Sequence, residues 1–189
     1  MAATFRDLDE LTTTGASELT VNANNLRVSG VEASCRLARD DLHQMSTYKD
    51  DIIDVGRALH LHPALIAAII SKQSRAGTAL KESGFGLYAD CFGLMQISKR
   101  FHVGKGEPFS RDHIDEGTTY LIHLIKTMKN REETWTREQH LKGALVGYMI
   151  GIEGVPRDHP DSLDSLTPTK DFANDVIARA KVFAGEGYV

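Results

Sequence analysis

The stretch HPALIAAIISKQSRAG, residues 62–77, is apolar on every face of a helix over most of its length. A helix without a polar face must be covered on all sides, so we expect this segment at the centre of the protein. Pro63 suits the first helical position, where its missing N–H is not needed, and Gly77 favours the end of the helix. Close to that end, Gln73 shares the inward face with Ile66 and places one amide group on an apolar surface.

Two segments of different character precede this central helix. Apolar residues recur at spacings of three and four over 35–59, which predicts one long helix with a single buried face. Residues 1–28 are polar and show little periodicity, so they predict an N-terminal arm. We expect residues 29–189 to form a single domain, because this length suits one hydrophobic core.

The segments after the central helix predict a small lobe and three further helices. Glycines crowd the section 81–108, which predicts loops and a short helix near 91–97, and leaves room for a small hairpin. Helical periodicity covers 112–128, a segment capped by Thr136, and 169–183. The expected architecture is mainly α, with one small irregular lobe beside the central helix.

Charge and hydropathy argue against two classes of partner. The formal net charge is −4, whereas a duplex-binding domain usually carries a basic face, so we expect no nucleic acid partner. The longest apolar run, 64–70, is too short to span a bilayer, and we expect no membrane partner. The hydrophobic content of 41% and charged content of 25% are typical of a soluble globular protein, which we expect to be a monomer.

Cysteine content and the N-terminus bear on the compartment. Two thiols, Cys35 and Cys91, in a chain of this length indicate reduced side chains, so we predict buried cysteines without a disulfide. The first residues, MAATFRD, lack the apolar core of a secretory signal peptide, which predicts a cytoplasmic protein. Release by a non-classical route leaves no mark in a sequence and stays open.

Three short motifs hold the polar side chains that could carry chemistry: Gln73, the segment FGLMQ at 92–96, and the segment GYMIG at 147–151. Taken singly, each is explained by packing, with a buried amide or a tyrosine ring in the core. Cysteine and histidine lack zinc-ligand spacing, and neither a Gly-x-Ser-x-Gly elbow nor a phosphate-binding loop occurs. We therefore predict no metal and no cofactor.

The order and spacing of the three motifs resemble those of goose-type (g-type) lysozymes. Residues 69–77 resemble the family's Ile-Ile-Ser-Arg-Glu-Ser-x-Ala-Gly, residues 92–96 match Phe-Gly-Leu-Met-Gln, and residues 147–151 stand in place of Ala-Tyr-Asn-Ala-Gly. The resemblance covers nearly the whole chain and looks most like the fish branch. It implies a lysozyme-like α+β fold, mainly α with a small β lobe. It also implies binding of the β-1,4-linked N-acetylglucosamine–N-acetylmuramic acid polymer of peptidoglycan, or of a chitin-type oligosaccharide.

Departures from the family's pattern fall on the residues that would carry the reaction. By resemblance, Gln73 stands at the position of the general-acid glutamate, and an amide has no proton to give. The two aspartates that position the attacking water fall on Leu87 and Ser98, and the asparagine of the third motif falls on Met149. Asp90, three residues beyond Leu87, is a candidate substitute for a lost carboxylate.

The sugar-contacting positions are better kept, and three functions follow. Residues that match the family's saccharide contacts are Gln96, His102 and Tyr148, with Met149 beside them. The first hypothesis is a g-type lysozyme homologue, a pseudoenzyme, that has lost hydrolysis and keeps weak glycan binding. The second is a weak muramidase in bacterial defence that uses Asp90 or a positioned water. The third is a protein-interaction or inhibitor role for the fold.

Overall fold

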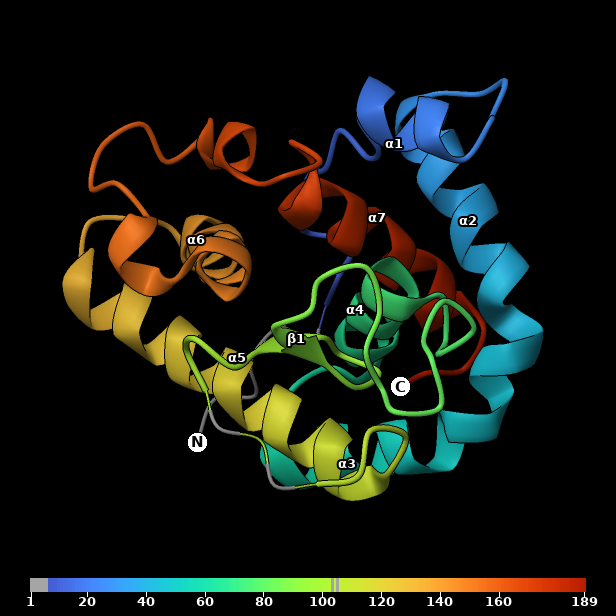
Figure 1. Ribbon diagram of the computed structural model, residues 1–189. Coiled ribbons are helices and arrows are strands. Elements are labelled where there is room, and N and C mark those ends of the chain that lie inside the picture. Colours follow the sequence, from blue (N-terminus) through green and yellow to red (C-terminus); the bar gives the residue numbers. More distant parts are fainter. Residues whose placement is uncertain (1–6, 103, 105) are drawn as a thin grey trace.

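The computed structural model, which describes residues 7–102, 104 and 106–189, is mainly helical with one small hairpin (Figure 1). The predicted fold class is confirmed. The helices are α1 (Glu18–Ala23), α2 (Gly30–Met45), α3 (Lys49–Leu59), α4 (Pro63–Ser74), α5 (Arg111–Arg131), α6 (Arg137–Ile150) and α7 (Phe172–Gly185). The 3-10 turns are η1 (Ser46–Tyr48), η2 (Ile152–Gly154) and η3 (Leu163–Leu166), and the strands are β1 (Cys91–Phe92) and β2 (Ile97–Ser98).

Helix α4 is the centre of the molecule, as its apolar sequence predicts. Every residue from Pro63 to Ser71 is buried, and α7, α3 and α2 all pack on it (Figure 1). Pro63 occupies the first turn, where His62 caps the helix by accepting a hydrogen bond from the Ala64 N–H at 3.1 Å. The helix stops at Ser74, three residues before Gly77, because the chain enters the left-handed region.

The predicted long helix over 35–59 is wrong, since a 3-10 turn divides it into α2 and α3. At the junction the Ser46 hydroxyl donates to the His43 carbonyl oxygen at 2.6 Å, so it takes up a carbonyl group of the last turn. The division lets α2 pack on α7 while α3 packs on α5.

The predicted short helix near 91–97 is also wrong, and the hairpin stands in its place. Strands β1 and β2 pair antiparallel, with Phe92 opposite Ile97. Between them Gly93 and Gln96 have φ angles of +76° and +47°, which a helix does not allow. Gly93 is required on a second ground, because a Cβ there would lie 2.2 Å from the ring of His113.

The remaining elements follow the sequence more closely. Helix α5 covers the predicted 112–128, and the capping box at Thr136 is formed by Gln139. Both cysteines are free, so the prediction of no disulfide is confirmed, although both are half-buried rather than buried. Over the described part of the chain, none of the helices has the length and apolar character needed to cross a membrane.

The N-terminal segment contributes to the same core as the rest. Helix α1 lies within the predicted arm of residues 1–28, and Leu8 and Leu11 are buried in the main hydrophobic cluster. The division into an arm and a domain over 29–189 stays a prediction.

Candidate active site

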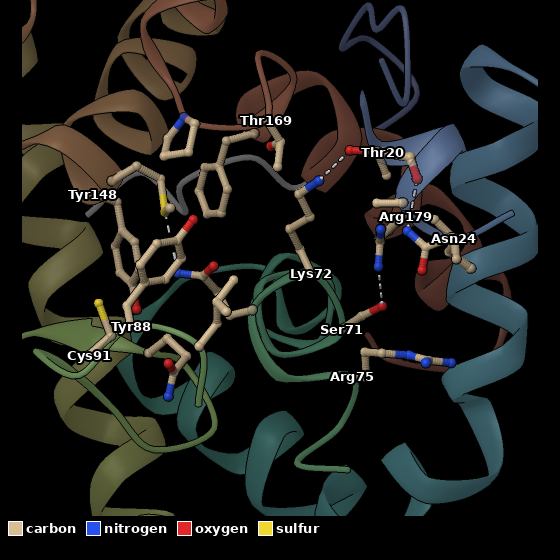
Figure 2. Close-up of a pocket in the computed structure, with 18 of the residues that line it drawn as sticks. Thr20, Asn24, Ser71, Lys72, Arg75, Tyr88, Cys91, Tyr148, Thr169 and Arg179 are labelled. Carbon is tan, nitrogen blue, oxygen red and sulfur yellow. Dashed lines mark hydrogen bonds between the residues drawn. The ribbon is translucent and has the colours of Figure 1, made fainter. Parts of the chain in front are cut away.

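A pocket of about 260 Å³ opens at the carboxyl end of α4 (Figure 2). Six of the eight predicted site residues line it, drawn from α4, the hairpin lobe and α6. They are Gln73, Leu87, Gln96, Ser98, Tyr148 and Met149. The other two, Asp90 and His102, lie outside its lining. The structure therefore gathers residues that are 76 positions apart in the sequence, such as Gln73 and Met149, around one opening.

Gln73 and Met149 contact each other directly. The Gln73 amide donates from Nε2 to the Met149 thioether sulfur at 3.3 Å, and both side chains are half-buried. A thioether is a weak acceptor and cannot donate. The predicted general-acid position is thus occupied by an uncharged amide paired with another uncharged side chain.

The two predicted water-positioning residues carry no charge and lie in different surroundings. Ser98 is buried in β2, and its hydroxyl oxygen accepts from the Arg100 N–H at 3.3 Å. Leu87 is 89% exposed at the mouth of the pocket, beside the half-exposed Tyr88. Neither side chain can hold water through a negative charge.

The carboxylate of Asp90 forms an ion pair with Arg100. Its Oδ2 lies 2.7 Å from Nε of Arg100, and its backbone oxygen accepts from the Lys99 N–H at 2.8 Å. Burial, together with the charge of Asp90, raises the pKa of the adjacent Cys91 thiol to about 11. Cys91 therefore lines the pocket as a protonated, weakly nucleophilic thiol.

Gln96 and Tyr148 hold the lobe together with their polar atoms. The Gln96 amide donates to the carbonyl oxygens of Gly93 and Gly84 at 2.9 and 3.3 Å. The Tyr148 hydroxyl donates to the Met95 carbonyl oxygen at 2.6 Å, and the residue is 2% exposed. Burial raises the pKa of Tyr148 well above its usual value, so this phenol stays a donor.

A row of four rings links this pocket to a larger neighbouring one. His102 stacks on Tyr120 at 5.4 Å, Tyr120 lies 5.6 Å from Tyr148, and Tyr148 stacks on Phe172 at 6.1 Å. His102 and Tyr120 line the neighbouring pocket, which has a volume of about 540 Å³ and includes Phe101. The row extends from one pocket into the other.

Sequence reasoning missed Phe101 and Tyr120. Phe101 is 42% exposed and directly precedes His102 in the chain. Its ring packs against Gly151, where an added Cβ would lie 2.7 Å from the ring. An aromatic residue next to a predicted sugar contact was the available signal. Tyr120 sits on the apolar face of α5, where packing is the default explanation, and its position in the row appears only in three dimensions.

Along the pocket, charged groups form a largely buried network between α4 and α7, in which Lys72 and Arg179 belong to the pocket lining. Nζ of Lys72 lies 3.0 Å from Asp171 and 2.8 Å from Asp175, and Arg179 donates to both oxygens of Asp175 at 2.9 Å. Burial acts to raise the pKa of Asp175, but the charges of Arg179 and Lys72 outweigh it and hold that pKa far below its usual value. Every charge in this network is paired.

The arrangement can bind a ligand but offers no strong acid where Gln73 stands. Among the described residues that line the pocket, the only carboxylate is Asp41, which accepts a hydrogen bond from Ser71 on the side of α4 away from the hairpin. Among the same described residues, no group of three or more histidine, cysteine or carboxylate side chains could hold a metal ion.

Known proteins resemble this chain from end to end. The family model of lysozyme g matches residues 5–187. Lysozyme g of Cyprinus carpio is 40% identical over 188 residues, which are 100% of each chain. Lysozyme g of Casuarius casuarius is 41% identical over 181 residues, 96% of each chain. The lysozyme g-like protein 2 of Homo sapiens is 34% identical over 184 residues, 97% of this chain and 82% of that protein.

Proposed function

The chain belongs to the lysozyme g family, and from that premise we propose that it binds peptidoglycan-type glycan but hydrolyses it poorly or not at all. Muramidase activity, the hydrolysis of the β-1,4 bond between N-acetylmuramic acid and N-acetylglucosamine, is the activity of the family. The proposal separates the two halves of that activity, binding and bond cleavage.

One observation carries the proposal: the Gln73 amide donates to Met149 where the family has its acid. Cleavage of a glycosidic bond needs a group that protonates the leaving oxygen, which in this fold is a carboxyl with a raised pKa. An amide N–H keeps the shape of that group but does not release its proton. Loss of general acid catalysis alone slows such reactions by about 10²–10⁴-fold.

The second half of the reaction is weakened too. Water that attacks the sugar must be oriented by a carboxylate across the ring from the acid. Ser98 and Leu87 stand at those predicted positions, and Asp90 is engaged by Arg100 outside the pocket lining. Restoring one carboxyl group would therefore leave the other requirement unmet.

Glycan binding rests on the aromatic row and the larger pocket beside it. Sugar sites in proteins combine apolar ring faces with a few polar groups, and Phe101, His102 and Tyr120 supply such faces in a pocket of about 540 Å³. Each charged or bidentate hydrogen bond lost at positions 98 and 149 costs about 1–3 kcal/mol. We therefore expect millimolar affinity for chitin-type oligosaccharides.

An interaction role is the second candidate, because Leu87 is 89% exposed and lies next to the half-exposed Tyr88. An exposed apolar pair at the mouth of a pocket suits contact with another protein.

A turbidity assay on a peptidoglycan suspension, run beside a pull-down on the same insoluble wall, tests these functions. A lysozyme g that carries the family's glutamate serves as the active reference. We expect the protein to sediment with the wall without clearing the suspension. Clearing at the reference rate would contradict the proposal in favour of a working muramidase. If the protein neither clears the suspension nor sediments with the wall, the interaction role is the candidate that remains.

A further inference from the structure

The pocket at Gln73 continues past α4 into a second compartment, which lies towards α1 and α2 (Figure 2). Figure 2 shows its labelled residues on the side of α4 opposite Tyr88 and Cys91. The residues that line this compartment are Asn24, Leu37, Asp41, Ser71, Arg75 and Arg179. None of these residues takes part in the proposed glycan binding.

Asp41 presents an incompletely satisfied carboxylate to this compartment. The residue is only 5% exposed, and its Oδ2 accepts from the Ser71 hydroxyl at 2.7 Å. Its Oδ1 lies 3.9 Å from Nε of Arg75, beyond hydrogen-bond distance, and no other described residue donates to it. Burial raises the pKa of Asp41, as expected when a carboxylate loses water without full compensation. A ligand N–H would supply the missing donor.

Arg75 offers the opposite charge in an available state. Its backbone caps α4 with a φ of +51°, which fixes where the side chain begins, while the side chain is 56% exposed. Arg179 differs, because it donates to Asp175 through Nε and Nη2 and to Ser71 through Nη1. Of the two guanidinium groups in the compartment, that of Arg75 is the one that donates no hydrogen bond to another described residue and lies 3.9 Å from a carboxylate oxygen.

Two opposite charges about 4 Å apart, one buried and one exposed, select the charge pattern of the ligand. A simple anion would be repelled by Asp41, and a simple cation by Arg75. A zwitterion would satisfy both groups, since its ammonium can donate to Asp41 while its carboxylate accepts from the guanidinium fork. Asn24 adds an acceptor, because its Nδ2 already donates to the Thr20 carbonyl oxygen at 2.8 Å.

We propose that this compartment binds the zwitterionic end of an α-amino acid, with the ammonium on Asp41 and the carboxylate on Arg75. Leu37 gives the wall one apolar side chain, which suits a short aliphatic substituent. The ligand is either a free amino acid or a larger molecule that carries an α-ammonium and an α-carboxylate at one end. The site belongs to the same pocket as Gln73 but lies on the other side of α4, and it stands whether or not the protein binds sugar.

Titration of the full chain with alanine, followed by amide NMR, tests the proposal. Alaninamide lacks the carboxylate and propionate lacks the ammonium, so they serve as matched probes. We expect alanine to shift the amide signals of Asn24 and Arg75 with millimolar affinity, and both analogues to bind at least about tenfold more weakly. Equal binding of propionate would overturn the proposal in favour of a simple anion site, and no shift with alanine would overturn it outright.

Two variants localise the effect. Arg75→Gln should weaken alanine binding by at least about tenfold, because it removes the carboxylate's partner. Arg111→Gln is the matched control, since Arg111 on α5 is also half-exposed and paired with an aspartate but does not line the pocket. Retained binding in Arg75→Gln, with a normal melting temperature, would contradict the assignment. Arg75 is exposed, so this variant should fold even where a change at Asp41 does not.

Discussion

The two sides of α4 differ in charge: one carries ion pairs, and the other carries uncharged polar side chains. On the side that faces α7, the partly buried Lys72 pairs with Asp171 and Asp175, and the buried Arg179 donates twice to the buried Asp175. On the side that faces the hairpin, the side chain of the neighbouring Gln73 hydrogen-bonds, within the described part of the chain, only to the sulfur of Met149. Adjacent positions of one helix thus enter an ionic network and the uncharged part of the pocket, which lies beside the hairpin.

The difference separates what the fold needs from what a reaction needs. The buried network links two helices through groups that would be costly to leave unpaired. Beside the hairpin, by contrast, the polar side chains of Ser98 and Gln73 keep hydrogen bonds without carrying a charge. We therefore expect stability and catalysis to depend on different faces of α4, and each face can be tested alone.

The largest expected effect is on the charged face. Asp175→Asn should lower the free energy of unfolding by about 3–5 kcal/mol, because it leaves Lys72 and Arg179 buried without their shared partner. Urea denaturation at pH 7 measures this. Asp54→Asn is the matched control, since the exposed pair of Asp54 with Arg111 should contribute less than about 1 kcal/mol. Equal effects of the two changes would break the comparison.

The second largest effect, about 3 kcal/mol or less in the free energy of unfolding, is expected at His113, which contacts the hairpin lobe. Burial lowers the pKa of His113 to about 4, and its Nε2 accepts from the Met95 N–H at 3.0 Å in the floor of the hairpin. The folded protein holds this ring neutral, whereas the unfolded chain takes up a proton below pH about 6.5. The free energy of unfolding should therefore fall by up to about 3 kcal/mol as the pH drops from about 6.5 to 4.

The variant His113→Gln removes this titration and should flatten the loss between pH 6.5 and 4. His43→Gln, at an exposed position of α2, serves as the control and should keep the slope of the parent. The network on the other face loses stability only below pH about 4, because the pKa of Asp175 is lowered and its contribution disappears as that carboxylate is protonated. If the free energy of unfolding of His113→Gln falls between pH 6.5 and 4 as steeply as that of the parent, His113 is not the group that titrates in this range, and the account is contradicted.

The smallest expected effect is on glycan binding. Phe101→Ala should weaken the binding of a chitin tetramer by about fivefold, because an exposed ring contributes about 1 kcal/mol through its face. The free energy of unfolding should stay unchanged, since the ring is partly exposed. Leu166→Ala, a comparably exposed apolar residue in η3, is the control for the titration by NMR. A loss of stability without a loss of binding would assign Phe101 to packing alone.

Sequence patterns predicted the elements whose periodicity is long and whose caps are local. Helix α4 was predicted from its apolar run and Pro63, and α6 from the capping box at Thr136. The break between α2 and α3 was missed, because the apolar spacing continues through Ser46 while a single hydroxyl takes a carbonyl of the last turn. The hairpin was confused with a helix because 91–97 is short and apolar.

The site was predicted by its residues more than by their contacts. Six predicted positions line one pocket, but the bond between Gln73 and Met149 joins residues far apart in sequence and could not be inferred from spacing. Asp90 appeared free in the sequence, whereas Arg100 engages it in the structure. Tyr120 joins the aromatic row only through the packing of α5 against α6. Pairings between distant residues need coordinates.

The central claim is that the uncharged face of α4 has lost catalysis at several positions together. Turbidity of a peptidoglycan suspension, measured for Gln73→Glu and for Gln73→Glu combined with Ser98→Asp and Met149→Asn, tests it most directly. A carboxyl at position 73 alone would face the Met149 sulfur, which cannot donate to it, and would lack an oriented water. The account predicts little clearing by the single variant and measurable clearing by the triple variant. Clearing by Gln73→Glu alone, at the rate of an ordinary g-type lysozyme, would contradict it.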